Sequence, residues 1–141
     1  AVVVDADAVV GNGVKIQNNV SVYSGVHIDD DVFVGPSAVF TNDRFPRAFD
    51  PEWERSDTFL RRGCSVGANA TLVCGITIGS FATVASGAVV TKDVAPFELV
   101  AGNPARRLGW VCACGRVLAR TTGPMPPTTC GHCGRGAGEP A

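Results

Sequence analysis

The sequence predicts an all-β protein, a parallel β-helix whose coils stack around one apolar core. Three observations carry this prediction: a six-residue period up to Phe40, its return at Cys64, and a second apolar series two residues behind the first. The first series comprises Val2, Ala8, Val14, Val20, Val26, Val32 and Ala38, then Cys64, Ala70, Ile76, Ala82, Ala88 and Val94. The second series comprises Val4, Val10, Ile16, Val22, Ile28, Val34 and Phe40, then Val66, Leu72, Ile78, Val84 and Val90.

Each six-residue unit predicts one short strand and one corner. Residues i and i+2 of a strand share a face, so each unit turns two apolar side chains inward. Three units would close a triangular coil of about eighteen residues, and such coils must stack because none buries its inner face alone. A sandwich of short strands is the alternative, but its turns are spaced less regularly. We expect glycines to serve the corners, namely Gly11, Gly35, Gly67, Gly75 and Gly79.

Composition favours a small protein with no nucleic-acid or membrane partner. The chain has 141 residues and a net charge of −1, which suits one domain with a small appendage. Its charge asymmetry is too mild to indicate nucleic acid, and no apolar run approaches the ~18 residues of a membrane span. The chain opens at Ala1 inside a repeat, without methionine or a visible signal peptide. We expect a truncated or processed N-terminus and a cytoplasmic location.

The repeat is interrupted by a charged loop, which we predict at residues 41–62. Loops longer than about 12–15 residues are uncommon unless they bind something or are disordered. This one contains Trp53, and its arginines suit phosphate or carboxylate groups. A solvated excursion without a ligand is the alternative.

Several blocks of the sequence resemble the hexapeptide-repeat acyltransferases, and in particular the subgroup that N-acetylates amino sugars carried on nucleotides. The likeness covers about residues 8–112. The blocks are KIQNNVSVY (Lys15–Tyr23), VFVGPSAVFTNDRFPRA (Val32–Ala48), RRGCSVGANATLVCGITIG (Arg61–Gly79), GAVVTKDV (Gly87–Val94) and AGNPARRLGW (Ala101–Trp110).

This resemblance implies a left-handed β-helix that assembles as a homotrimer, with active sites between neighbouring subunits. It implies acetyl transfer from acetyl-CoA to the amine of a dTDP- or UDP-linked amino sugar, which the loop would help to cover. Members of the family usually carry further coils before the KIQNN block, and those coils are absent from this sequence.

The resemblance also implies a catalytic residue, Asn42. Many acetyltransferases use a histidine base, but His27 lies between two inward residues and should point outward, and His132 lies between cysteines. We therefore predict no histidine base. In the resembling family the FTN asparagine holds the sugar amine, which loses its proton to solvent or to the departing thiolate. The alternative is an asparagine that favours a turn.

Further residues are expected to contact the two substrates, the sugar nucleotide and acetyl-CoA. Asn18 and Asn19 could instead pack as stacked corner residues, and Asp43 could instead form a salt bridge with a loop arginine. The predicted sugar-nucleotide residues are Asn18, Asn19, Tyr23, Asp43, Arg44, Arg47 and Arg61.

The acetyl-CoA site is predicted from stacking. Residues eighteen apart should superpose, which aligns small residues along one edge as a groove for the pantetheine arm, unless they only permit tight corners. Basic residues near the end of the repeat would meet the phosphates. The predicted acetyl-CoA residues are Ala68, Ala85, Ser86, Lys92, Pro104 and Arg106, with Arg107 beside them.

The C-terminal residues 111–141 are predicted to form a zinc-ribbon-like tail after a β-helix domain at 1–110. Cys112 and Cys114 form one pair, Cys130 and Cys133 another, and fifteen residues separate the pairs. Four thiolates at this spacing can complete a closed, structural Zn²⁺ site. Disulfides are the competitor, but a reducing compartment disfavours them. Cys64 and Cys74 fall on or beside the repeat and are predicted not to bind metal.

Two other functions remain open beside the N-acetyltransferase. One is O-acetyl transfer within the same superfamily, although that reaction generally relies on a histidine base. The other is a non-catalytic β-helix scaffold with the tail as a docking module, which the arginine-rich loop and the GNPAR block argue against. A β-helix carbonic anhydrase would need three histidines, and the chain has two.

Overall fold

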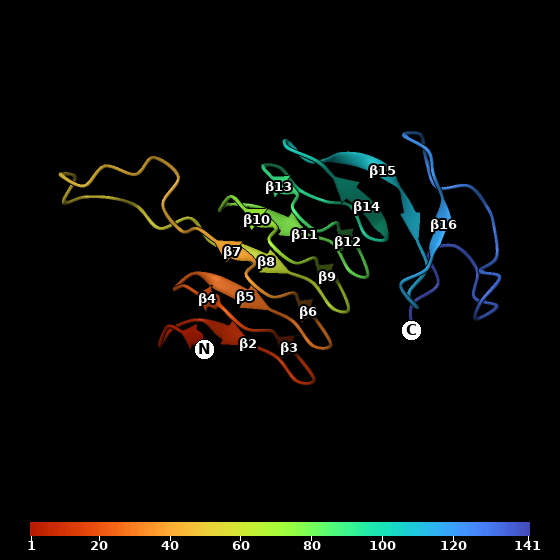
Figure 1. Ribbon diagram of the computed structural model, residues 1–141, viewed down its shortest axis with the longest axis horizontal. Helices are drawn as coiled ribbons and strands as arrows, with labels where there is room; N and C mark the ends of the chain where they lie inside the picture. Colours follow the sequence, from red (N-terminus) through yellow and green to blue (C-terminus); the bar gives the residue numbers. More distant parts are fainter.

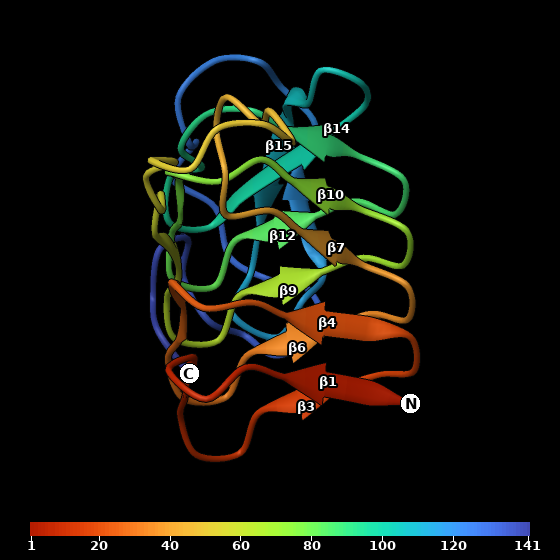
Figure 2. The ribbon, with the colours of Figure 1, turned by 90° about the vertical axis from the view of Figure 1, so that its left-hand side faces the viewer.

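The computed structural model covers residues 1–141 and shows a left-handed parallel β-helix, as predicted. Sixteen short strands stack in three faces, and no helix is present (Figures 1 and 2). No segment therefore forms an apolar helix long enough to cross a bilayer.

The three faces follow one another in each coil. The first face holds β1 (Val2–Val4), β4 (Val20–Val22), β7 (Val39–Phe40), β10 (Thr71–Leu72) and β13 (Val89–Val90). The second face holds β2 (Val9–Val10), β5 (Val26–Ile28), β8 (Thr58–Leu60) and β11 (Thr77–Ile78). The third face holds β3 (Lys15–Ile16), β6 (Phe33–Val34), β9 (Ser65–Val66), β12 (Thr83–Val84) and β14 (Glu98–Ala101), then the tail strands β15 (Arg106–Val111) and β16 (Val117–Ala119).

The eighteen-residue register is confirmed for most of the helix, and it fails in the last coil. Val2 pairs with Val20 and Thr83 pairs with Ser65, both eighteen residues apart. Val84, however, pairs with Val100, only sixteen residues on. The prediction that Pro104 lies in register above Ser86 is therefore wrong, because the chain loses two residues between β13 and Val94.

The two apolar series form one continuous core, as predicted. Twenty-two buried residues make up this cluster, from Val20 to Ala105. Cys64 is part of it and Cys74 is also buried. The valines of β1 and β2 remain exposed, because the first coil has only one neighbouring coil to pack against.

The corners explain much of the polar sequence. Left-handed backbone recurs every six residues, and it is occupied by residues that tolerate it, such as Asn19, Asp31 and Gly25. The five glycines do lie at corners, as predicted, but for two different reasons. Among the five, Gly75 alone has a positive φ. The other four are glycine because a Cβ would lie 2.4–2.7 Å from atoms of the next coil.

The corners of successive coils stack into three edges of the β-helix. Each edge is named after a residue or segment that lies on it. The loop edge comprises residues 5–7, 23–25, 41–57, 73–75 and 91–93. The Arg61 edge comprises residues 11–13, 29–31, 61–63, 79–81 and 95–97. The Asn18 edge comprises residues 17–19, 35–37, 67–69 and 85–87.

The inserted loop is shorter than predicted. It leaves the helix after β7 and returns at β8, so it spans residues 41–57 and not 41–62. Thr58 and Leu60 are buried and pair with Val26 and Ile28. The repeat thus resumes six residues before Cys64. Figure 1 shows the loop as an arm that projects well away from the coils.

The tail continues the third face instead of standing apart from it. β15 runs antiparallel to β14, and β16 runs antiparallel to β15. The predicted boundary between residues 110 and 111 falls inside β15. The division into two domains stays a prediction, whereas the shared sheet is visible beside the helix in Figure 1.

Candidate functional site

Asn42 lies at the base of the inserted loop, where the chain leaves β7. Its Nδ2 donates a hydrogen bond to the carbonyl oxygen of Ser24, 3.2 Å away in the preceding coil. Its own carbonyl accepts a bond from the backbone N–H of Ser56, which closes the loop. Because Nδ2 is held by Ser24, the Oδ1 atom is oriented away from that bond and remains an acceptor. An acceptor at this position can orient an amine.

A network beside Asn42 was not predicted. His27 points outward, as predicted, but it is half-buried, stacks on Phe59 at 4.7 Å and bonds to Asp57 at 3.0 Å. Arg55 bridges Asp57 at 2.9 Å and Asp7 at 2.7 Å. Hydrogen bonds from His27 and then Arg55 hold the pKa of Asp57 below its usual range. The one available signal was the position of Thr58, six residues before Cys64, which places Asp57 at the loop's return.

The loop encloses a cavity of about 490 Å³, the loop pocket. Four carboxylates line it, from Asp43, Asp50, Glu52 and Glu54, together with the single guanidinium of Arg44. Arg44 is committed to the carbonyl of Cys74 at 2.9 Å. The arginines of the loop therefore do not gather as a phosphate cradle, and the loop pocket is acidic.

The predicted sugar-nucleotide residues divide among three edges. Tyr23 is exposed on the loop edge, one coil before Asn42, and Asp43 and Arg44 lie in the loop pocket. Arg47 bonds to the neighbouring carbonyl of Pro46 in the projecting arm. The remaining three lie elsewhere in the same chain.

Asn18, Asn19 and Arg61 are remote from the loop base within one chain. The backbone of Ser37 bonds to Asn18, and Asn19 has a φ of 62°, so both asparagines shape corners of the Asn18 edge. Arg61 lies on its own edge, 3.8 Å from Asp29 and stacked 4.9 Å from the Phe59 ring. One subunit alone does not bring these residues to Asn42.

The small residues predicted to bind acetyl-CoA lie on the Asn18 edge. Gly87 donates its backbone N–H to Ala68, and Ala85 donates to Val100, so successive corners are in tight contact. Ala68, Ala85 and Ser86 are thus stacked as predicted. Pro104 follows a cis peptide between β14 and β15 and leaves this row.

The basic residues predicted to bind acetyl-CoA meet in a second cavity, the end pocket, of about 570 Å³. Its floor consists of inward residues of the last coil, Val90, Val94 and Val100. Lys92 and Arg106 line its rim, and neither forms an ion pair within the chain. Asp93 and Glu98 also line the pocket, but Glu98 is paired with Arg107, which leaves Lys92 and Arg106 as the cations that can hold an anionic group there.

Arg107 ties the tail to the end pocket. Its Nε lies 2.5 Å from Oε2 of Glu98, and its guanidinium stacks on the Trp110 ring at 4.4 Å. It also donates to the carbonyls of Thr122 and Gly123, and Trp110 Nε1 donates to Gly123 at 3.0 Å. Thr122 thereby becomes a wall of the cavity.

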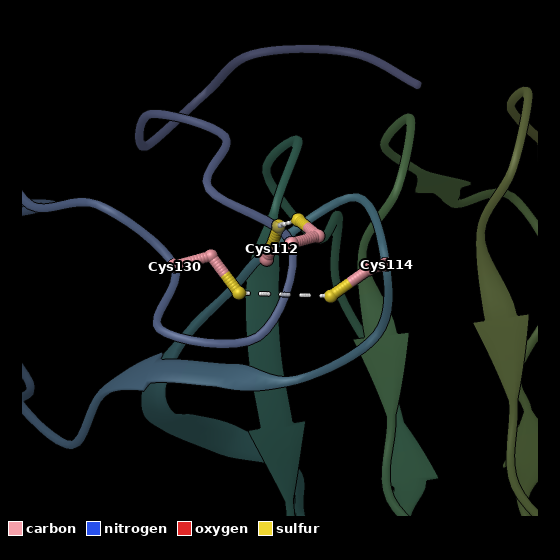
Figure 3. Close-up of side chains that lie close together, drawn as sticks. Cys112, Cys114 and Cys130 are labelled. Carbon is pink, nitrogen blue, oxygen red and sulfur yellow. Dashed lines mark hydrogen bonds between the residues drawn. The ribbon is translucent and has the colours of Figure 1, made fainter.

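The four tail cysteines converge, as their spacing predicted (Figure 3). All their Sγ atoms lie within 4.8 Å of one another, with Cys112 and Cys133 3.5 Å apart and Cys114 and Cys130 3.7 Å apart. The backbone N–H of Arg135 lowers the pKa of Cys133, and those of Cys133 and His132 lower the pKa of Cys130. Burial raises the pKa of Cys112.

Fold and repeat together define a hexapeptide-repeat β-helix protein, and comparison with known proteins agrees. The model of the bacterial transferase hexapeptide family (six repeats) matches residues 7–42. The chain is 47% identical over 57 residues to the dTDP-3-amino-3,6-dideoxy-alpha-D-galactopyranose 3-N-acetyltransferase of Aneurinibacillus thermoaerophilus, a match that covers 40% of this chain and 30% of that protein.

Solved structures share the fold. A hexapeptide-repeat acetyltransferase of Vibrio cholerae, complexed with acetyl coenzyme A, superposes with a TM-score of 0.69 at 28% identity over 79% of this chain and 65% of that one. A maltose O-acetyltransferase of Clostridium difficile gives 0.71 at 22% identity over 79% and 64%. The chain thus resembles the hexapeptide-repeat transferases in sequence over residues 7–42 and in fold over most of its length. It spans less than a third of the length of the curated relatives that it matches.

Proposed function

We propose that this protein transfers an acetyl group from acetyl-CoA to the amino group of a dTDP- or UDP-linked amino sugar. The observation that carries the proposal is the 47% identity to an N-acetyltransferase that acts on a dTDP-linked amino sugar. The proposed assembly is a homotrimer with the active site between subunits, in the cytoplasm.

Asn42 is the proposed catalytic residue. An amine that attacks a thioester needs a free lone pair and alignment with the carbonyl. With Nδ2 fixed by Ser24, the Oδ1 atom would accept one amine hydrogen and direct the lone pair to the thioester. The nitrogen forms the new C–N bond as the C–S bond breaks, and the amine proton leaves to solvent or to the coenzyme thiolate.

The acidic loop pocket supports an amine acceptor over a hydroxyl. A sugar amine is cationic in its protonated form, and carboxylates such as Asp43 attract it, whereas a hydroxyl gains little from them. The nucleotide phosphates need cations from elsewhere. In a trimer, Arg61 and Asn18 of a neighbouring copy would supply contacts that one chain cannot bring to Asn42.

The donor is proposed to lie along the Asn18 edge and the end pocket. Backbone groups beside Ala68, Ala85 and Ser86 would bond the pantetheine amides. Lys92 and Arg106 would then meet phosphate groups, because they are the cations without carboxylate partners in the end pocket.

Calorimetric titration with acetyl-CoA tests the donor half. We expect about one site per subunit, with at least tenfold weaker binding in the Lys92→Ala/Arg106→Ala double variant and unchanged binding in Lys15→Ala. Lys15 is exposed on β3 at the other end of the helix. A folded protein that shows no saturable binding would favour a non-catalytic scaffold.

Matched acceptors test the acceptor half. A dTDP-linked sugar with an amine at carbon 3, the same sugar with a hydroxyl there, and maltose would each be incubated with acetyl-CoA and the products weighed by mass spectrometry. We expect one added acetyl group on the amine alone. Acetylation of the hydroxyl sugar or of maltose would favour the O-acetyltransferase that the fold also admits.

A further inference from the structure

We propose that Cys112, Cys114, Cys130 and Cys133 bind one structural Zn²⁺ ion, and that this ion holds the tail as a wall of the end pocket. The cysteines come from the two ends of the tail, and the segment that reaches the pocket lies between them in sequence. The ion would therefore close the segment 112–133 into a loop pinned at both ends.

The distances fit a tetrahedral metal site. Four sulfurs at about 2.3 Å from zinc are separated by about 3.8 Å from one another. Two pairs across the turns, Cys112–Cys133 and Cys114–Cys130, lie 3.5 and 3.7 Å apart, and all four sulfurs lie within 4.8 Å of one another. Both turns are built for this approach. Gly115 and Gly134 have φ values of 94° and 78°, and Cys112 and Cys130 form backbone hydrogen bonds with residues of their own turns.

The same tail contacts the end pocket midway between the two cysteine pairs. Gly123 accepts hydrogen bonds from Trp110 and Arg107, and the adjacent Thr122 lines the pocket. Apart from a bond from Arg107 to the Thr122 carbonyl, the other hydrogen bonds of the segment 120–129 stay within the tail, from Gly123 N–H to Thr121 Oγ1 and from Ala137 N–H to the Thr128 carbonyl. Pinning Cys130 to Cys112 through a metal limits how far Thr122 can move.

Metal content and thiol count test the site. The protein, purified without added metal or chelator, should contain one zinc per chain by elemental analysis and, after denaturation with a chelator, six reactive thiols. Cys130→Ser should lose at least 90% of the zinc, whereas His132→Ala, at an exposed position between the ligands, should keep it. Iron in place of zinc, or only two reactive thiols, would overturn the proposal.

Fluorescence tests the link to the pocket wall without any substrate. The chain has two tryptophans, so Trp53→Phe leaves only Trp110, which is 7% exposed. Removing zinc from this variant with a chelator, or adding Cys130→Ser, should shift the emission to longer wavelength. The β-sheet circular dichroism should persist, because the coils have their own core. An unchanged emission spectrum in zinc-free protein would refute the link.

A last experiment, which compares acetyl-CoA binding with and without zinc, depends on the proposed function. If the end pocket receives acetyl-CoA, the zinc-free protein should bind it at least fivefold more weakly than the zinc-loaded protein. Equal affinity of both forms would refute the coupling to the donor site. Absence of binding by the zinc-loaded protein would contradict the proposed function and leave the zinc site to be decided by metal content and fluorescence.

Discussion

His27 and Asp57 hold the inserted loop closed: Nε2 of His27 lies 3.0 Å from Oδ2 of Asp57, although the two residues are thirty positions apart in the sequence. Arg55 extends the contact to Asp7 in the first coil. The returning arm of the loop is thus bound to two successive coils of the helix. Asn42 stands at the other arm, so its position depends on this closure.

Replacing Asp57 by Asn should destabilise the protein in a pH-dependent way. Hydrogen bonds from His27 and then Arg55 lower the pKa of Asp57 in the folded state. A depressed carboxyl pKa stabilises the fold above the unfolded value of about 3.9, and this stabilisation is lost as the pH falls through the folded pKa. Thermal unfolding should show the variant a few degrees below wild type at pH 7, with the gap narrowing below about pH 4.

Glu54→Gln is the matched control, since Glu54 is exposed on the same arm and forms no ion pair. It should melt within a degree of wild type at both pH values. A gap for Asp57→Asn that stays constant from pH 7 to pH 3 would mean that the carboxylate charge contributes nothing.

Gly25→Ala should loosen the loop base. Gly25 has a φ of 91°, and a Cβ there would lie 2.8 Å from Cδ of Arg55 and from Oδ1 of Asp57. Backbone strain alone costs about 1–2 kcal/mol. Gly75→Ala supplies the comparison, because Gly75 shares the positive φ while its Cβ would have ordinary contacts. Denaturant unfolding should show a larger loss for Gly25→Ala, and equal losses would contradict the predicted clash.

Thr58→Val should stabilise the protein. Thr58 takes an inward position of β8 and is 1% exposed, yet its hydroxyl oxygen has no hydrogen-bond partner. An unsatisfied buried hydroxyl is unfavourable, and valine has nearly the same shape. We expect a gain of about 1 kcal/mol in the free energy of unfolding, with Thr71→Val on the half-buried outer side of β10 giving almost none. A destabilised Thr58→Val would indicate that the hydroxyl is bonded in solution.

Asn42→Ala should reduce turnover while leaving acetyl-CoA affinity nearly intact. The substitution removes the acceptor proposed to orient the amine, and lost orientation can reduce a rate by roughly 10²-fold. Steady-state kinetics with the dTDP-linked amino sugar would measure turnover, and calorimetry would measure affinity. Asn12→Ala, at an exposed corner of the Arg61 edge, should behave as wild type. Wild-type turnover in Asn42→Ala would remove Asn42 from the mechanism.

The six-residue pattern predicts the strands from β1 to β13 except β8, the core, and the stacking register through β13. It failed where a small local change has a large effect on register. Because Thr58 is polar, the apolar pattern does not reveal where the repeat resumes, and the predicted loop is five residues longer than the observed one. The two-residue shortening after β13 keeps Val94 inward but pairs it with Ile78, which the first apolar series did not predict.

The cysteine cluster could be predicted from spacing, because each cysteine pair lies in one short turn and the two turns need only approach each other. The network at the base of the loop could not be predicted, because Asp57 lies in the insertion, where the six-residue period gives no information about its position relative to His27. Asn18 and Asn19 are predicted to contact the same sugar nucleotide as Asn42, but their position after β3 puts them on a different corner of the chain. Assigning each strand to a face, not only to the inside, would have separated them.

Finally, β15 runs antiparallel to the strands of the third face, and this changes the edge that the end of the coil stack presents to another chain. A parallel coil stack offers each end as a template on which another identical chain could add, and long filaments would follow. At this end the template runs the wrong way, because the outermost strands lie antiparallel to the coils beneath them. The tail thus ends the parallel stacking on the third face, because a further parallel coil would not continue in register on antiparallel strands.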